Sequence, residues 1–96
     1  MEYYVYILRC SDGSYYTGVT NDHEKRLQEH QEGHNRNSYT FRRRPVQLVH
    51  LETFTEISWA IAREKQIQPW NRQKKEALIQ ANYEKLQIFS KKKFKR

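Results

Sequence analysis

Two short segments near the start of the chain alternate between apolar and polar positions. They span residues 3–10 and 14–20, are rich in tyrosine and valine, and are separated by Ser-Asp-Gly. Alternation with a period of two predicts strands, and a short polar segment that contains glycine predicts a tight turn. We therefore expect a β-hairpin over residues 3–20.

The rest of the pattern predicts a third strand and three helices. The strand is expected over residues 46–53, and the helices over 22–32, from 55 to the residue before Pro69, and over 72–83. The polar segment 34–44 predicts a loop. These elements make an α+β protein (α/β in the broad sense), with helices packed on a three-stranded sheet.

Several helix ends carry residues that favour caps. Asn21 followed by Glu24 forms a capping box, and Gly33 suits the left-handed residue at a C-terminal end. Thr55 and Asn71 are able to cap the second and third helices.

The hairpin turn decides which tyrosines share a face. A two-residue turn at Asp12-Gly13 would place Tyr6 and Tyr16 on opposite faces of the sheet. A three-residue turn with Gly13 in the left-handed region would instead pair Tyr6 with Gly18 and put both phenols on one face. We favour the three-residue turn, because Ser-Asp-Gly suits it and because it gives one face a distinct character.

Composition narrows the class of protein and its partners. The 96 residues suffice for one domain, the mean hydropathy is −1.10, and the net charge is +7. Arginine and lysine runs at residues 42–44 and 91–96 favour a polyanion as partner. No apolar run approaches the roughly 20 residues of a membrane span. The single Cys10 indicates a reducing, cytoplasmic setting.

Two helices carry polar residues where apolar ones are expected. Arg26 and His30 lie four residues apart on a helix whose one clear apolar residue is Leu27. In the second helix, Glu64 falls within an apolar stripe of Ala60, Ile61 and Ile67. A carboxylate there needs either a cation, such as Arg26 or Arg63, or a divalent metal. A zinc site formed by His23, His30 and His34 is a weaker hypothesis than a metal at Glu64, because the spacing of these histidines fits zinc poorly.

The candidate residues suit phosphodiester hydrolysis on a basic protein: two phenols, an arginine, a histidine and a half-buried carboxylate.

The sequence also resembles a known family. Two segments separated by nine residues resemble the paired signature of the GIY-YIG nucleases. They are YVY at residues 4–6 and YTG at residues 16–18. RLQEH at 26–30 and AREKQI at 62–67 resemble its helix and metal-binding segments. Tyr4 replaces the first glycine of the signature and Thr17 its isoleucine.

The resemblance implies a three-stranded antiparallel sheet flanked by three helices, in a nuclease domain over residues 1–83 followed by a basic tail over 84–96. It implies one Mg²⁺ or Mn²⁺ ion held by Glu64. It implies Tyr6 as general base, Tyr16 positioning water or phosphate, Arg26 stabilising the transition state, and His30 relaying a proton.

The activity implied is metal-dependent hydrolysis of DNA by an endonuclease or exonuclease that is structure-specific and of the repair type. A larger protein partner would supply specificity, since the chain has no room for a separate recognition domain. A second hypothesis is a nucleic-acid-binding module or adaptor that keeps the fold with little turnover. The expected nucleic-acid contacts are basic residues of the two runs: Arg42, Arg43, Arg44, Lys91, Lys92 and Lys93.

Deleting residues 91–96 should weaken the salt dependence of DNA binding. Each phosphate contact contributes about −0.9 to the slope of log K against log salt on duplex DNA, so losing tail contacts flattens that slope. Fluorescence anisotropy over a salt series measures it. An unchanged slope would show that the tail does not touch DNA.

Overall fold

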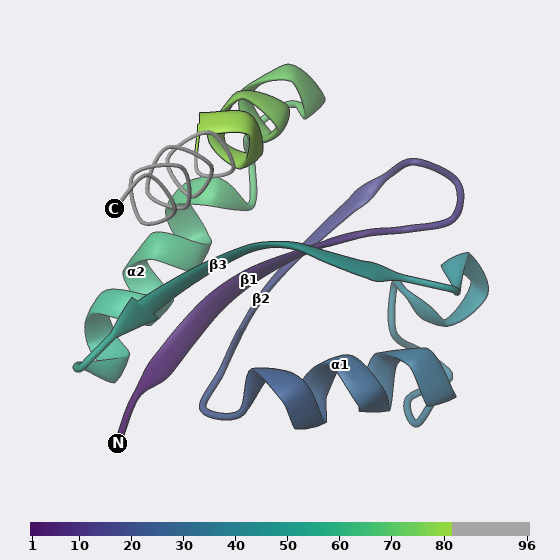
Figure 1. The fold of residues 1–96 in the computed structure, drawn as a ribbon, viewed down its shortest axis with the longest axis horizontal. Helices are drawn as coiled ribbons and strands as arrows, with labels where there is room; N and C mark the ends of the chain where they lie inside the picture. The colour runs from purple at the N-terminus through teal and green to yellow at the C-terminus, as the bar shows by residue number, and fades with distance from the viewer. Residues whose placement is uncertain (82–96) are drawn as a thin grey trace, which may run out of the picture.

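The computed structural model contains a three-stranded antiparallel sheet with helices on both faces (Figure 1). It describes residues 1–81, so the basic tail lies outside the described residues. In chain order the elements are β1 (Tyr3–Arg9), β2 (Tyr15–Thr20), α1 (His23–Glu32), the short 3₁₀ helix η1 (Phe41–Arg43), β3 (Gln47–Phe54), α2 (Ile57–Ile67), and a helix over 72–81. No helix within 1–81 is long and apolar enough to cross a membrane. The predicted α+β class is confirmed.

The hairpin has the register expected for a three-residue turn. Leu8 pairs with Tyr16, and Tyr6 pairs with Gly18. Gly13 adopts a φ of 83°, in the left-handed region. The Asp12 carboxylate accepts hydrogen bonds from the backbone and hydroxyl of Ser14 at 3.0 and 2.6 Å, which holds the turn closed.

The strand order β2-β1-β3 makes β1 the central strand and β2 an edge. One face carries Val5 and Ile7, which pack against Ala60 and Ile67 of α2. The other face carries Tyr6, Leu8 and Cys10 with Val46, and Leu27 of α1 packs there. The sheet therefore separates α1 from α2 and the helix over 72–81 (Figure 1).

Two of the predicted helix caps are wrong. Asp22, not Asn21, caps α1, and its carboxylate accepts from the backbone N–H of Lys25 at 3.1 Å. The Thr20 hydroxyl accepts from the backbone N–H of Asp22 at 3.1 Å, and this turn moves the cap one residue along the chain. Thr55 does not cap α2, since Glu56 occupies that position without a side-chain bond.

The other predicted ends are confirmed. Gly33 ends α1 with a φ of 70°, in the left-handed conformation. Asn71 accepts from the backbone N–H of Lys74 at 2.9 Å, as expected of a cap for the helix over 72–81. The predicted loop over 34–44 contains η1, which sequence reasoning missed.

A polar network ties α2 to β3. Arg63 donates two hydrogen bonds to the Glu52 carboxylate, at 2.9 and 3.1 Å, and the Nε2 atom of buried His50 lies 2.7 Å from the same group. The His50 hydrogen bond and the Arg63 guanidinium lower the pKa of Glu52 to about 2. This pairing commits Arg63 to Glu52, so Arg63 does not neutralise Glu64.

Replacing Glu52 with glutamine should destabilise the fold by about 2 kcal/mol, because a half-buried cation and a buried imidazole lose their anionic acceptor. The folded-state pKa lies below the ordinary value of 4.5, so the carboxylate stabilises the fold above about pH 4.5 and loses this effect as pH falls toward 2. Urea unfolding at several pH values should show the gap between wild type and Glu52→Gln shrinking in acid.

Glu56→Gln is the matched control, because Glu56 is exposed and its side chain makes no hydrogen bond among residues 1–81. It should shift the unfolding free energy by less than about 0.5 kcal/mol. An equal loss in both variants, or a gap that is constant from pH 7 to pH 2, would contradict a special role for Glu52.

Candidate active site

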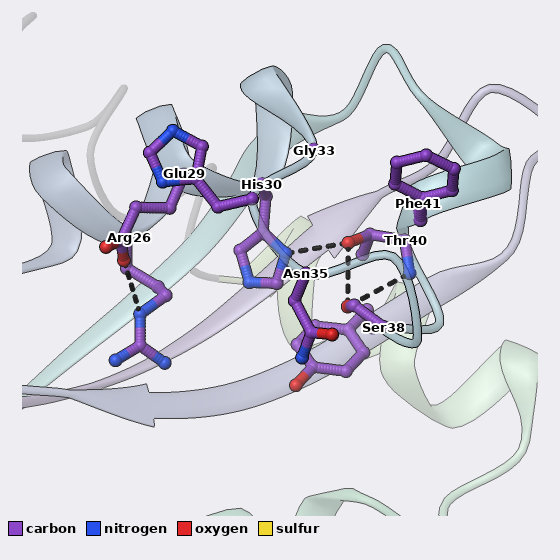
Figure 2. A pocket seen from close by; sticks show the side chains of 10 residues that line it. Arg26, Glu29, His30, Gly33, Asn35, Ser38, Thr40 and Phe41 are labelled. Atoms are coloured by element: carbon purple, nitrogen blue, oxygen red, sulfur yellow. Dashed lines mark hydrogen bonds and ion pairs between the residues drawn. The ribbon is translucent and has the colours of Figure 1, made fainter.

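A chain of hydrogen bonds runs from the sheet through α1 to the following loop. The buried Tyr6 hydroxyl lies 3.1 Å from Nε2 of His30, and His30 Nδ1 lies 2.7 Å from the Thr40 hydroxyl. Thr40 is 1% exposed and its hydroxyl lies 3.1 Å from that of Ser38. Figure 2 shows the His30 ring between Arg26 and Thr40, with the bonds to Thr40 and Ser38 dashed.

The environment of this chain favours neutral groups. Burial raises the pKa of the Tyr6 hydroxyl well above its usual value, and Tyr16 acts in the same direction while Arg26 opposes it. Burial, and secondly the Arg26 charge, lower the pKa of His30. If Thr40 accepts from His30 Nδ1–H and donates to Ser38, then His30 Nε2 is left to accept from Tyr6. In that arrangement the neutral imidazole of His30 accepts a hydrogen bond from the Tyr6 hydroxyl.

A cavity of about 260 Å³ lies beside this chain. Tyr16, Arg26, Glu29 and His30 line one part of it, and residues of the segment 33–41 line the rest. The Arg26 side chain is 45% exposed and bonds to Glu29 through Nε at 3.1 Å. The guanidinium also hydrogen-bonds to the Tyr6 hydroxyl, which lowers the pKa of that phenol. A guanidinium has five N–H donors, so donors beyond these two contacts are left for a ligand.

Gly18 allows Tyr6 to reach α1. The Tyr6 ring lies directly against the backbone of Gly18, and an added Cβ there would lie only 2.5 Å from Tyr6 Cζ. The hydroxyl that meets His30 therefore depends on a missing side chain on the neighbouring strand. Four predicted site residues, Tyr6, Tyr16, Arg26 and His30, are brought together on this face.

Glu64, the fifth predicted residue, lies apart from this cavity. It belongs to α2, which packs on the opposite face of the sheet, and it does not line the 260 Å³ cavity. Gln68 follows one turn later on the same side of the helix, and it lines a second cavity together with Tyr16. Glu64 therefore lies on the side of α2 that leads to the edge strand β2.

Neither of the two arginines considered as ion-pair partners of Glu64 pairs with it. The predicted alternative partners are engaged elsewhere, Arg26 with Glu29 and Arg63 with Glu52. In the described part of the chain, the half-buried Glu64 carboxylate has no hydrogen-bond or ion-pair partner. Mg²⁺ is commonly bound by one or two carboxylates, with water and substrate phosphate as the remaining ligands.

Residues 1–81 contain no cluster of three or more acidic, histidine or cysteine side chains that could hold a metal by itself. The three histidines considered as a zinc site each contact a different residue. His23 contacts Tyr4, His30 contacts Tyr6, and His34 bonds to Glu32. A metal at Glu64 would therefore depend on ligands from water and substrate.

The arginine run is only partly free to bind nucleic acid. Arg43 bonds to Asp12 and to the Tyr39 carbonyl, at 3.1 and 2.8 Å. Arg44 donates to the Phe41 carbonyl at 2.8 Å. Arg42 is exposed, and no partner for its side chain is found among residues 1–81. Of the three, Arg42 has the most accessible charge.

Sequence reasoning missed the contribution of the loop that precedes β3. Thr40 and Ser38 complete the hydrogen-bond chain from His30, and the Tyr39 ring stacks beside Tyr16 with centroids 6.2 Å apart. The segment Ser-Tyr-Thr is more apolar and hydroxyl-rich than the polar residues around it. That local change in composition was the available signal for this segment. The contacts of Thr40 and Tyr39 with the site depend on the three-dimensional path of the loop.

Comparison with known proteins identifies the class. The model of the GIY-YIG catalytic domain matches residues 2–77. The chain therefore belongs to the GIY-YIG family, in agreement with the resemblance found in its signatures.

Within this family the chain is similar to small UPF0213 proteins. It is 51% identical to a UPF0213 protein of Syntrophus aciditrophicus over 83 residues, which cover 86% of this chain and 95% of that one. Two solution NMR structures are also similar. The UPF0213 protein BH0048 of Bacillus halodurans has a TM-score of 0.55 at 40% identity, covering 84% of this chain and 85% of that one. The protein EF2693 of E. faecalis has a TM-score of 0.60 at 34% identity, covering 86% and 88%.

Replacing Gly18 with alanine should displace Tyr6 and separate it from His30. The added Cβ cannot fit beside the ring, so we expect a loss of about 1–3 kcal/mol in unfolding free energy. Chemical denaturation measures the stability, and the NMR shifts of the His30 ring report the broken contact.

The background variant Tyr6→Leu tests the cause. With no aromatic ring to displace, Gly18→Ala should cost much less in that background than in the wild type. Equal costs in the two backgrounds would mean that Gly18 matters for the strand itself and not for Tyr6.

Proposed function

We propose that this protein is a divalent-metal-dependent nuclease that hydrolyses phosphodiester bonds in DNA. The observation that carries the proposal is the Tyr6–His30–Thr40 hydrogen-bond chain beside Tyr16 and Arg26. A protein that only bound nucleic acid would need the arginine but not a buried relay of proton acceptors.

The relay supplies a route for the proton of an attacking water. The raised pKa of Tyr6 keeps it a neutral phenol near pH 7, so it does not act as a preformed phenolate. Instead, Tyr6 accepts a proton from water as it passes its own to Nε2 of His30. A Thr40 hydroxyl that accepts from His30 Nδ1–H would hold the imidazole in the tautomer that this transfer requires.

Arg26 and Tyr16 would bind the phosphate that is attacked. The Arg26 guanidinium is charged at all relevant pH values and can donate two N–H groups to phosphate oxygens. Negative charge increases on those oxygens in the transition state, so an arginine fixed beside them lowers the barrier. The Tyr16 hydroxyl adds a donor at the rim of the same cavity.

Glu64 would hold the Mg²⁺ or Mn²⁺ ion. Such an ion, when bound, stabilises charge on the leaving oxygen and polarises the phosphoryl group. Glu64 lies on the side of α2 that leads to the edge strand β2, whereas Arg26 and His30 lie on the opposite face of the sheet. A substrate strand lying along β2 would therefore meet both sets of groups.

The remaining parts of the proposal concern the wider substrate and setting. Arg42 and the lysines of the tail would contact phosphates away from the cleaved bond. The activity would be structure-specific and directed at DNA that arises in repair. A larger protein partner would supply further specificity. The protein would act in the cytoplasm, where the buried thiol of Cys10 stays reduced.

The direct test is cleavage of labelled duplex, nicked, flapped and single-stranded DNA with Mg²⁺, Mn²⁺ or EDTA. Metal-dependent cleavage of at least one substrate is expected, and EDTA should abolish it. Absence of cleavage with every substrate and metal, together with retained binding, would favour a binding module or adaptor.

Glu64→Gln should lower the cleavage rate by about 10²-fold or more while the protein stays folded, because a neutral amide binds the divalent ion much more weakly than a carboxylate. DNA binding should be kept or tightened, since a negative charge near phosphate is removed. Arg26→Ala should lower both cleavage and affinity, whereas Tyr6→Phe should lower turnover with little change in affinity. Cleavage kinetics and anisotropy separate the three effects.

Glu56→Gln, at the residue that precedes the same helix, is the control and should cleave like the wild type. If Glu64→Gln unfolds the protein and its folded fraction still cleaves, then Glu64 is a structural residue. The role assigned to the carboxylate would then be wrong.

A further inference from the structure

Lys75 is a largely buried lysine, and no carboxylate among residues 1–81 pairs with it. It lies in the helix over 72–81 and is 8% exposed. Burial lowers the pKa of its ammonium group. Its neighbour in sequence, Glu76, is engaged by Arg72 at 3.6 Å and by the Tyr15 hydroxyl at 3.4 Å. Among residues 1–81 there is no acceptor for the Lys75 ammonium group.

Lys75 borders a cavity of about 230 Å³ at the edge strand β2. The cavity is lined by residues from both faces of the sheet: Tyr15, Tyr16, Thr17, Tyr39, Gln68 and Lys75. Thr17 is 5% exposed, and its hydroxyl is buried without a hydrogen-bond partner in the described part of the chain. The enclosed Thr17 hydroxyl and the ammonium group of the largely buried Lys75 thus lie at one cavity, and neither has a partner among residues 1–81.

Tyr16 connects this cavity to the candidate active site, because it lines both cavities. A group bound beside Lys75 would therefore lie next to the phosphate bound by Arg26 and Tyr16. No carboxylate lines the cavity, so nothing within it repels an anion.

We propose that Lys75 and Thr17 form a second phosphate-binding site, which holds the phosphate adjacent to the one that is cleaved. The inference rests on the proposed function only in taking a nucleic-acid strand as the ligand. With this second site, the protein would bind two successive phosphates of one strand that lies along the edge strand β2.

The chemistry of the two groups favours phosphate. A lysine binds phosphate as a point charge, and a hydroxyl donates to a phosphate oxygen. A bound phosphate would provide the acceptors that Lys75 and Thr17 otherwise lack, which offsets the cost of burying them. The competing explanation is that the lysine stem only packs on Tyr15 and Trp70 while its ammonium reaches water.

Thymidine 3′,5′-bisphosphate and the two thymidine monophosphates test the proposal by calorimetric titration in EDTA. For the wild type, we expect the bisphosphate to bind about tenfold more tightly than either monophosphate. Lys75→Met keeps an unbranched apolar stem and removes the charge, so it should keep the fold and lose the tenfold gain. Equal gains in the variant and the wild type would overturn the proposal.

Two further variants distinguish a specific phosphate-binding site from an effect of the protein's net charge. Lys74→Met removes the neighbouring exposed lysine, which lies over the Trp70 ring at 4.3 Å, and should keep the gain. Loss of the gain in Lys74→Met as well would show that net charge alone is responsible. Thr17→Val replaces the hydroxyl with a methyl group of similar size and should weaken bisphosphate binding without lowering stability. Unchanged binding in Thr17→Val would remove Thr17 from the site.

The metal-free titration keeps this inference distinguishable from the proposed function. A wild-type protein that binds the bisphosphate through Lys75 but cleaves no DNA would support the phosphate site and refute the nuclease activity. A protein that cleaves DNA but shows no Lys75-dependent gain would refute the second phosphate site alone.

Discussion

The close approach of the Tyr6 ring to the backbone of Gly18 sets the geometry of the α1 face. It follows from a three-residue turn, in which left-handed Gly13 places the two residues opposite each other. A slip of one residue in this register would turn one strand's side chains to the other face and separate Tyr6 from Tyr16. The hydrogen bond from Tyr6 to His30 then joins the sheet to α1, and the loop residue Thr40 fixes the far side of the imidazole.

The edge strand β2 is where the two faces of the sheet meet. Tyr16 points toward the α1 side and Thr17 toward the α2 side, as neighbouring residues of a strand must. Cation and hydroxyl groups gather along this edge from elements that are far apart in sequence. A linear anionic polymer is the ligand that best matches such an arrangement, because it can contact both sides at once.

Most local features of the structure could be predicted from the sequence, whereas long-range contacts could be predicted only where the family resemblance implied them. The sequence allowed two hairpin turns, and the Ser-Asp-Gly segment favoured the three-residue turn whose register the structure has. Asn71 was correctly predicted as a helix cap. The α1 cap was misplaced by one residue because the Thr20–Asp22 turn competes with the capping box. For the site, sequence predicted the proximity of Tyr6, Tyr16, Arg26 and His30, while their chemical roles stay predictions. The burial of Lys75 and the contact of Thr40 with His30 depend on packing between distant segments, which no local pattern encodes.

The way α1 is attached has a consequence for its local stability. This helix has no fully buried residue, and it is held by Leu27, the Tyr6–His30 bond and a pair of hydrogen bonds between the Gln31 amide and the backbone of Val46, at 2.6 and 2.9 Å. Few apolar contacts oppose its detachment, so α1 belongs to the part of the molecule that opens at low free energy, well before the central strand β1. The helix that carries Arg26 and His30 is then a unit that exchanges its amide hydrogens by local opening, and binding a ligand to those side chains would slow that exchange.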